Sequence, residues 1–149
     1  VTLDPDTAHA RLVLSEDHSF VRWEHARQDL PKTLERFTAW SCVLGQQKFR
    51  DGRHYWKVEM VVEEGEDDSW WAVGVAKESV KRTEFVKFSP ENGIWGVQRV
   101  SGEFVALTSP HTPLSPVPRT IWVYLDYPLG LVTFINADTG DEIFTFQRA

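Results

Sequence analysis

The chain has 149 residues, of which 42% are hydrophobic and 26% charged, and a formal net charge of -6. This length and composition are typical of one globular domain, and no apolar run approaches the ~20 residues that a membrane-spanning helix needs. The negative charge, with no Lys/Arg cluster longer than Lys81-Arg82, argues against nucleic acid as a partner, because affinity for a phosphate backbone comes from such cations.

Alternating apolar and polar residues predict short strands along the whole chain. In residues 56–62 every even position is apolar, whereas Lys57 and Glu59 point to the opposite face. In residues 71–76 large residues alternate with Ala and Gly, which predicts a strand whose second face lies close to another layer. The strands expected, in chain order, are residues 11–14, 20–23, 56–62, 71–76, 94–100, 104–107, 121–127, 131–135 and 142–146.

The segments between the strands have turn composition. Residues 127–130 (Tyr-Pro-Leu-Gly) predict a hairpin turn, and residues 32–37 are the one segment where we expect a helical turn. Four prolines within residues 110–118 predict an extended surface connection. Many short strands without a core helix indicate an all-β fold of two antiparallel sheets packed face to face.

The cysteine and glycosylation patterns favour a reducing compartment, so we expect a cytoplasmic domain. The single cysteine, Cys42, cannot form an internal disulfide, and no Asn-x-Ser/Thr acceptor occurs. The chain starts at Val1 with no signal peptide and no initiator Met, so we expect it to be a piece of a longer protein.

The residues that would support catalysis or metal binding do not form a recognised pattern. Cys42 has apolar neighbours, which predict a buried, inert thiol. The five histidines lack metal-ligand spacing, and there is no Gly-rich phosphate loop. Residues 63–68 hold five carboxylates and are expected to form a water-facing loop, or alternatively a docking strip for a basic partner. We therefore expect no catalytic residue, no metal and no cofactor.

Seven tryptophans are many for this length, and they fall into two groups. The strand patterns assign Trp56, Trp71, Trp95 and Trp122 to the core. Trp23, Trp40 and Trp70 are less clearly placed, and an exposed Trp is a frequent binding hot spot.

Three segments of the chain carry a family pattern. They are residues 3–8 (Leu-Asp-Pro-Asp-Thr-Ala) with 12–17, residues 43–45 (Val-Leu-Gly) with 52–59, and residues 125–136. Together they resemble the PRY-SPRY (B30.2) domain of tripartite-motif ubiquitin ligases and butyrophilins, although Lys57 stands where an acidic residue is usual and Ile135 where an aromatic one is. The resemblance implies one domain over 1–149, a concanavalin-like SPRY jelly roll with PRY at about 1–45 and SPRY at about 46–149.

The same resemblance implies a ligand groove on this chain. Its positions here are Trp40, Ala72, Lys87, Gln98, Val100, Phe104 and Val105. A phosphorylated metabolite needs several cations, and among the matching positions only Lys87 and His111 could supply them, which argues against this ligand. Gln98 and Val100 stand where other members have the tryptophans that grip antibody constant regions, which argues against that ligand too. The groove therefore suits a peptide or protein loop.

Our leading hypothesis is a target-binding domain of a tripartite-motif E3 ubiquitin ligase, with specificity in residues 24–42, 63–70, 77–93 and 98–119. A butyrophilin intracellular domain is the alternative, and a sugar-binding, lectin-like sandwich is a third class. The resemblance also implies further strands beyond Ala149. Without these strands, an exposed sheet edge would allow the isolated domain to form a strand-exchanged dimer. We also expect the full-length protein to be dimeric. We expect no direct membrane contact by this domain.

Overall fold

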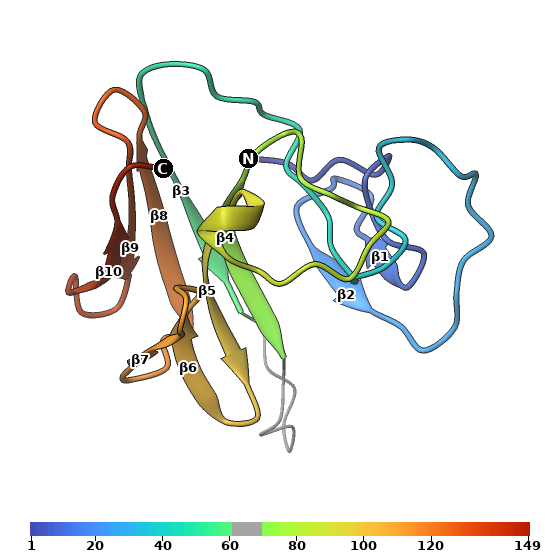
Figure 1. The fold of residues 1–149 in the computed structure, drawn as a ribbon. Helices are drawn as coiled ribbons and strands as arrows, with labels where there is room; N and C mark the ends of the chain where they lie inside the picture. Colours follow the sequence, from blue (N-terminus) through green and yellow to red (C-terminus); the bar gives the residue numbers. More distant parts are fainter. Residues whose placement is uncertain (61–69) are drawn as a thin grey trace. The chain divides into compact units, whose positions relative to one another are not determined.

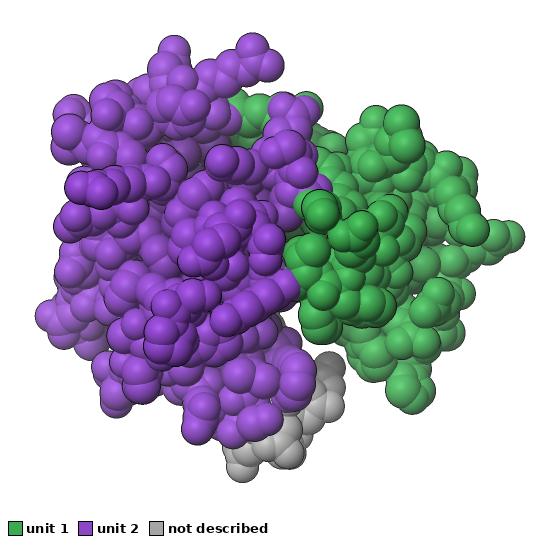
Figure 2. All heavy atoms as spheres, in the orientation of Figure 1, with its two compact units in different colours: residues 1–48, 81–86 green, residues 49–80, 87–149 purple. Residues whose placement is uncertain are grey.

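A computed structural model describes residues 1–60 and 70–149 of the chain. These residues divide into two compact units, coloured separately in Figure 2: unit 1 comprises residues 1–48 and 81–86, and unit 2 comprises residues 49–80 and 87–149. The acidic loop or docking strip expected at residues 63–68 lies outside the described residues.

Unit 1 contains one small hairpin. Strands β1 (Leu12–Leu14) and β2 (Val21–Trp23) pair antiparallel, close to the bounds expected from the sequence. The turn between them is organised by Asp17, whose carboxylate accepts hydrogen bonds from the hydroxyls of Ser15 and Ser19, both at 2.7 Å. These bonds stabilise the charged carboxylate and lower the pKa of Asp17 to about 2.

The rest of unit 1 is irregular and depends on side-chain hydrogen bonds. Arg36 is only 6% exposed. Its guanidinium donates to the carbonyls of Pro31 (2.9 Å), Pro5 (3.1 Å) and Ala8 (2.7 Å). The helical turn expected at residues 32–37 does not form, and the segment makes bends that bring Arg36 to these distant carbonyls.

Unit 2 holds two four-stranded antiparallel sheets, with the strand orders β10-β9-β8-β3 and β4-β5-β6-β7 (Figure 1). Their bounds are β3 Arg53–Glu59, β4 Trp71–Ala76, β5 Ile94–Val100, β6 Glu103–Ala106, β7 Thr112–Leu114, β8 Thr120–Asp126, β9 Leu131–Asn136 and β10 Glu142–Phe146. The expected all-β, two-layer fold is confirmed. The expected hairpin is also present, since β8 leads directly to β9 through a turn in which Gly130 has a φ of 66°.

Inward-facing side chains of both sheets form one core in unit 2. The fully or nearly fully buried members are Trp95, Val97, Phe104, Ala106, Ile121, Val123, Leu125, Val132, Phe134 and Phe146. Each large side chain of this kind stabilises the fold by about 1.5–3 kcal/mol through removal of apolar surface from water. Trp56 and Trp71 pack against this core and are only partly buried.

The sequence-based assignment of Trp122 to the core is wrong. On β8 the residues that enter the core are Ile121 and Val123, so Trp122 lies on the outer face of its sheet. There its ring is 5.6 Å from that of Tyr55 and 5.5 Å from the Lys57 ammonium. Residues 121–125 are all apolar or aromatic, and such a run does not reveal which set of alternate residues faces inward.

Two short elements were not expected from the sequence. Strand β7 lies within the proline-rich segment, at the edge of its sheet. An edge strand tolerates Pro113, which has no amide hydrogen to donate, because one side of such a strand needs no hydrogen bonds to a neighbour. A 3-10 helix, η1 (Pro90–Asn92), ends at Gly93, which has a φ of 77°. Both elements are only three residues long and contain a proline, so neither shows the alternation or helical spacing by which an element is predicted.

Candidate functional site

The outer face of the β4-β5-β6-β7 sheet brings three of the expected groove residues into one row. Ala72 on β4 pairs with Gln98 on β5, Gln98 pairs with Val105 on β6, and Val105 pairs with Pro113 on β7. Directly paired residues project from the same face of a sheet. The row therefore crosses all four strands, and Pro113 is a member that the sequence did not identify.

The same face continues toward the β5–β6 hairpin. Val100 pairs with Glu103, and the two residues between them, Ser101 and Gly102, have φ values of 50° and 77°. Positive φ at both central residues makes this the tight turn that suits the twist of a hairpin. Val100 thus lies on the outer face two residues beyond Gln98, beside the exposed Glu103.

Trp70 flanks this end of the sheet. The last pair of the antiparallel β4–β5 ladder is Trp71 with Arg99. Trp70 directly precedes Trp71 and Val100 directly follows Arg99, so both residues lie at this end of the ladder. Trp70 is 67% exposed. Two-residue alternation puts it on the side of Ala72. Trp70 is absent from the expected groove, although its residue type was a signal for a binding role.

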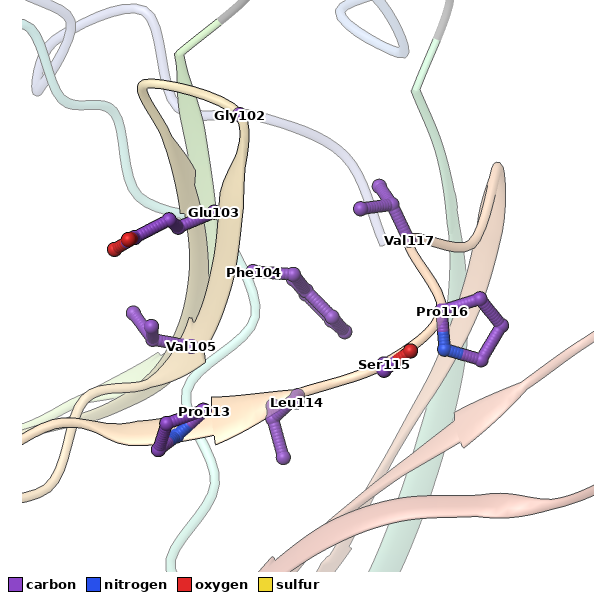
Figure 3. A pocket seen from close by; sticks show the side chains of 9 residues that line it. All are labelled: Gly102, Glu103, Phe104, Val105, Pro113, Leu114, Ser115, Pro116 and Val117. Carbon is purple, nitrogen blue, oxygen red and sulfur yellow. The ribbon is translucent and has the colours of Figure 1, made fainter.

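A pocket of about 320 Å³ lies where β6 begins and β7 ends (Figure 3). It is lined by Gly102, Glu103, Phe104, Val105, Pro113, Leu114, Ser115, Pro116 and Val117. In Figure 3 the Phe104 ring points toward the segment 115–117, whereas the side chains of Glu103 and Val105 project from the other side of β6. Most of the lining side chains are apolar, apart from one carboxylate and one hydroxyl, but the surface of the pocket is nearly as polar as it is apolar.

Two further expected groove residues lie away from this row. Phe104 is 4% exposed and packs in the core, with its ring 5.8 Å from that of Trp71, so it reaches the site only through the pocket lining. Lys87 is exposed and lies before η1, where its carbonyl accepts a 2.7 Å hydrogen bond from Asn92. The structure therefore groups Ala72, Gln98, Val100 and Val105 but not these two.

Trp40 belongs to unit 1, where it forms an exposed aromatic pair. Its indole Nε1 donates to the carbonyl of Val86 at 2.8 Å. The ring of Phe85 meets the Trp40 ring edge-on, with centroids 4.8 Å apart. Trp40 is 39% and Phe85 is 70% exposed. This geometry suits contact with a partner, and Phe85 is a site candidate that sequence reasoning missed.

The titratable groups of unit 1 favour structural roles. Burial raises the pKa of the Cys42 thiol to about 11, so it stays protonated at neutral pH and is a poor nucleophile. His9 is 4% exposed, and burial, followed by the charges of Arg27 and Arg11, lowers its pKa. In residues 1–60 and 70–149, no group of three or more His, Cys, Asp or Glu side chains is placed to hold a metal ion.

Within the same described ranges, no helix is long and apolar enough to cross a membrane.

The row on the outer face is partly exposed: Ala72 and Pro113 are exposed, Gln98 and Val100 are half-buried, and Val105 is 6% exposed. A β-sandwich with such a mixed apolar and polar sheet face suits a recognition module. The SPRY-associated domain PRY matches residues 1–49, and the SPRY domain matches residues 53–149. The chain belongs to the SPRY family, whose domains of this type are non-catalytic binding modules.

Curated relatives of two kinds are similar to the chain. Human butyrophilin subfamily 1 member A1 is 46% identical over 99% of the chain. Human zinc finger protein RFP is 43% identical over 100% of it, and human E3 ubiquitin-protein ligase TRIM58 is 40% identical over 99%. The chain spans less than a third of each of these proteins, namely 28%, 29% and 30% of their lengths.

Two solved structures share the fold. Stonustoxin is 26% identical, with a TM-score of 0.79, over 98% of this chain and 24% of the stonustoxin chain. The TRIM65 PSpry domain has the same TM-score of 0.79 and 23% identity, over 98% of this chain and 76% of the other. At that identity the second likeness concerns the fold alone.

Proposed function

We propose that this domain binds a peptide or protein loop through the outer face of the β4-β5-β6-β7 sheet and the loops around it. The observation that carries the proposal is the row of Ala72, Gln98, Val105 and Pro113, which continues to Val100. Apolar residues with isolated polar groups suit a protein partner, because the apolar surface contributes affinity and the polar groups fix orientation.

Trp40 is proposed separately, as a binding residue of unit 1. Its indole is fixed by the bond to the Val86 carbonyl and by the Phe85 ring. An aromatic side chain that is already held in one position loses little conformational freedom when a partner binds. Lys87 and Phe104 complete the proposed set, Lys87 as an exposed cation and Phe104 as part of the pocket wall.

The protein that carries the domain is proposed to be a tripartite-motif E3 ubiquitin ligase, in which this module selects the target and another domain performs ligation. A butyrophilin is the second candidate, and the 46% identity to butyrophilin 1A1 supports it. In either case we propose a cytoplasmic module, which the single Cys42 and the lack of a glycosylation acceptor support.

The test is an affinity capture from cell extract followed by mass spectrometry, with the partner then re-expressed and its affinity measured directly. We expect Gln98→Arg and Trp40→Ala each to weaken binding at least tenfold while the melting temperature changes by less than about 3 °C. Asp141→Asn, at an exposed position between β9 and β10, serves as the control and keeps full affinity.

Two results would contradict the proposal. A purified partner that binds both variants as tightly as it binds the original domain would place the interface elsewhere. A large fall in melting temperature for Gln98→Arg would mean that this residue supports the fold and not the site.

A further inference from the structure

Among the residues that the structure describes, the outer face of the candidate site has one carboxylate, and no other group compensates its charge. Glu103 opens β6, opposite Val100, and is exposed. Among residues 1–60 and 70–149 its side chain takes part in no ion pair and no hydrogen bond. An exposed carboxylate without an internal partner is free to pair with a cation from another molecule.

An apolar surface adjoins this carboxylate. The pocket of about 320 Å³ has Glu103 in its lining together with Val105, Pro113 and Val117. The Glu103 side chain projects from the same side of β6 as Val105, away from the segment with Val117 (Figure 3). Val105 is 6% exposed, so the apolar surface open to solvent on that side is that of the exposed Pro113, which pairs with Val105. A pocket of this size accepts one bulky apolar side chain, which gains stability by leaving water.

An exposed indole flanks the same end of the sheet. Trp70 and Val100 both flank the end of the β4–β5 ladder, and Val100 is paired with Glu103. The face of an indole attracts a cation through its quadrupole, and an arginine guanidinium stacks on it well. Trp70 and Glu103 thus offer a cation two kinds of contact on either side of Val100.

From this arrangement we propose that the site selects a basic, extended segment of its partner. An Arg or Lys side chain of that segment lies over Val100, between Trp70 and Glu103, and a neighbouring apolar side chain enters the pocket. The formal net charge of -6 assists by attracting basic segments over a longer range. This inference rests on the proposed function and adds the chemical class of the partner.

The test uses a random library of twelve-residue peptides displayed on phage and selected against the purified domain. We expect the enriched peptides to carry Arg or Lys next to Leu, Ile, Met or Phe. The best peptide, synthesised with a fluorescent label, is then titrated by anisotropy. Glu103→Gln should weaken it at least fivefold, whereas Asp141→Asn, which removes the same charge at an exposed position outside the pocket, should change it less than twofold.

Two further arms strengthen the assignment. A selection repeated on Glu103→Lys should enrich acidic peptides in place of basic ones. Raising the salt from 50 to 500 mM should weaken the peptide on the original domain and have little effect on Glu103→Gln, because the charge pair is exposed and therefore screened.

The outcomes separate this inference from the function on which it rests. Enriched peptides without a cation, or equal affinity for Glu103→Gln, would overturn the basic-segment inference and leave a peptide-binding module in place. If no peptide is enriched and no purified partner binds, the proposed function fails and the inference fails with it.

Discussion

Arg36 is the side chain on which unit 1 depends most, so we predict that Arg36→Ala severely destabilises that unit. The residue is 6% exposed, and its guanidinium donates to three backbone carbonyls, those of Pro31, Pro5 and Ala8. Unit 1 has only two strands of three residues each, so its loops are held by scattered backbone hydrogen bonds, such as that from the Phe37 amide to the Thr7 carbonyl, together with the bonds of Arg36.

The magnitude follows from the carbonyls that the substitution leaves without a partner. A hydrogen bond from a charged donor contributes about 1.5–3 kcal/mol, and a buried acceptor left unsatisfied costs about 1–3 kcal/mol. Water will reach some of the three carbonyls once the side chain is gone. We therefore expect a loss of about 3–5 kcal/mol in the free energy of unfolding, a large share of the ~5–15 kcal/mol that holds a typical protein folded.

The assay is urea denaturation followed by circular dichroism, combined with hydrogen exchange read by mass spectrometry. In Arg36→Ala the amides of residues 1–48 should lose protection more than those of β8 and β9. Arg22→Ala is the control, because that side chain is 67% exposed and its ion pair with Glu24 lies at the surface. Such a pair contributes ~1 kcal/mol or less.

A small effect would refute this reasoning. If Arg36→Ala costs less than about 1 kcal/mol, or if its exchange pattern matches that of Arg22→Ala, the three hydrogen bonds do not hold unit 1 together. A partial rescue by Arg36→Lys, which keeps the charge and loses the planar fork of donors, would show how much of the effect depends on geometry.

Three other predictions concern packing, thiol chemistry and pH. Gly74→Ala should cost about 2–3 kcal/mol, because an added Cβ would collide with the Trp95 carbonyl oxygen and lie 2.6 Å from the Gly96 Cα, as urea denaturation will show. Cys42, with a pKa of about 11, should react with iodoacetamide ~100-fold more slowly at pH 8 in the folded protein than in urea. The lowered pKa of His9 means that the unfolded chain binds a proton more readily, so stability should fall as the pH drops below 6.5, measured by melting temperature.

Each of these three predictions has a result that would contradict it, and the Gly74 substitution has a matched control on the same strand. Ala76→Ser, at an exposed position of the same strand, should change stability by less than ~0.5 kcal/mol. If Gly74→Ala also changes the stability by less than ~0.5 kcal/mol, β4 and β5 can move apart at no cost in free energy. Equal alkylation rates in buffer and urea would show an accessible Cys42 thiolate. In His9→Gln the melting temperature should depend less on pH below pH 6.5. If it falls with pH as steeply as in the original protein, other groups cause the pH dependence.

The strand content and the class of fold follow from the sequence because strand alternation is a local property. Residues 71–76, 94–100 and 142–146 were predicted with the bounds that the structure shows. The family resemblance also follows from the sequence, since it rests on ordered motifs. Local alternation fails where both sets of alternate residues are apolar, which is why Trp122 was misassigned, and where a strand is short and contains proline, which is why β7 was missed.

The candidate site was only partly readable from the sequence. Ala72, Gln98, Val100 and Val105 were expected, but the register of three antiparallel pairings is what aligns Ala72, Gln98 and Val105 and adds Pro113. Phe85 joins Trp40 across more than forty residues of chain, a contact that no local pattern encodes.

The sequence by itself therefore determined that this chain forms strands, most of the segments that form them and the family it belongs to, because these depend on neighbours along the chain; it missed β7 and placed β3 at 56–62, whereas the strand runs over Arg53–Glu59. Only the tertiary structure decided which face of each strand meets the core and which side chains share a surface. The inward face of β8, the burial of Phe104 and the position of Glu103 opposite Val100 all depend on the packed arrangement of the sheets. Pairing register and burial are set by the free energy of the whole packed arrangement, which no short stretch of residues contains.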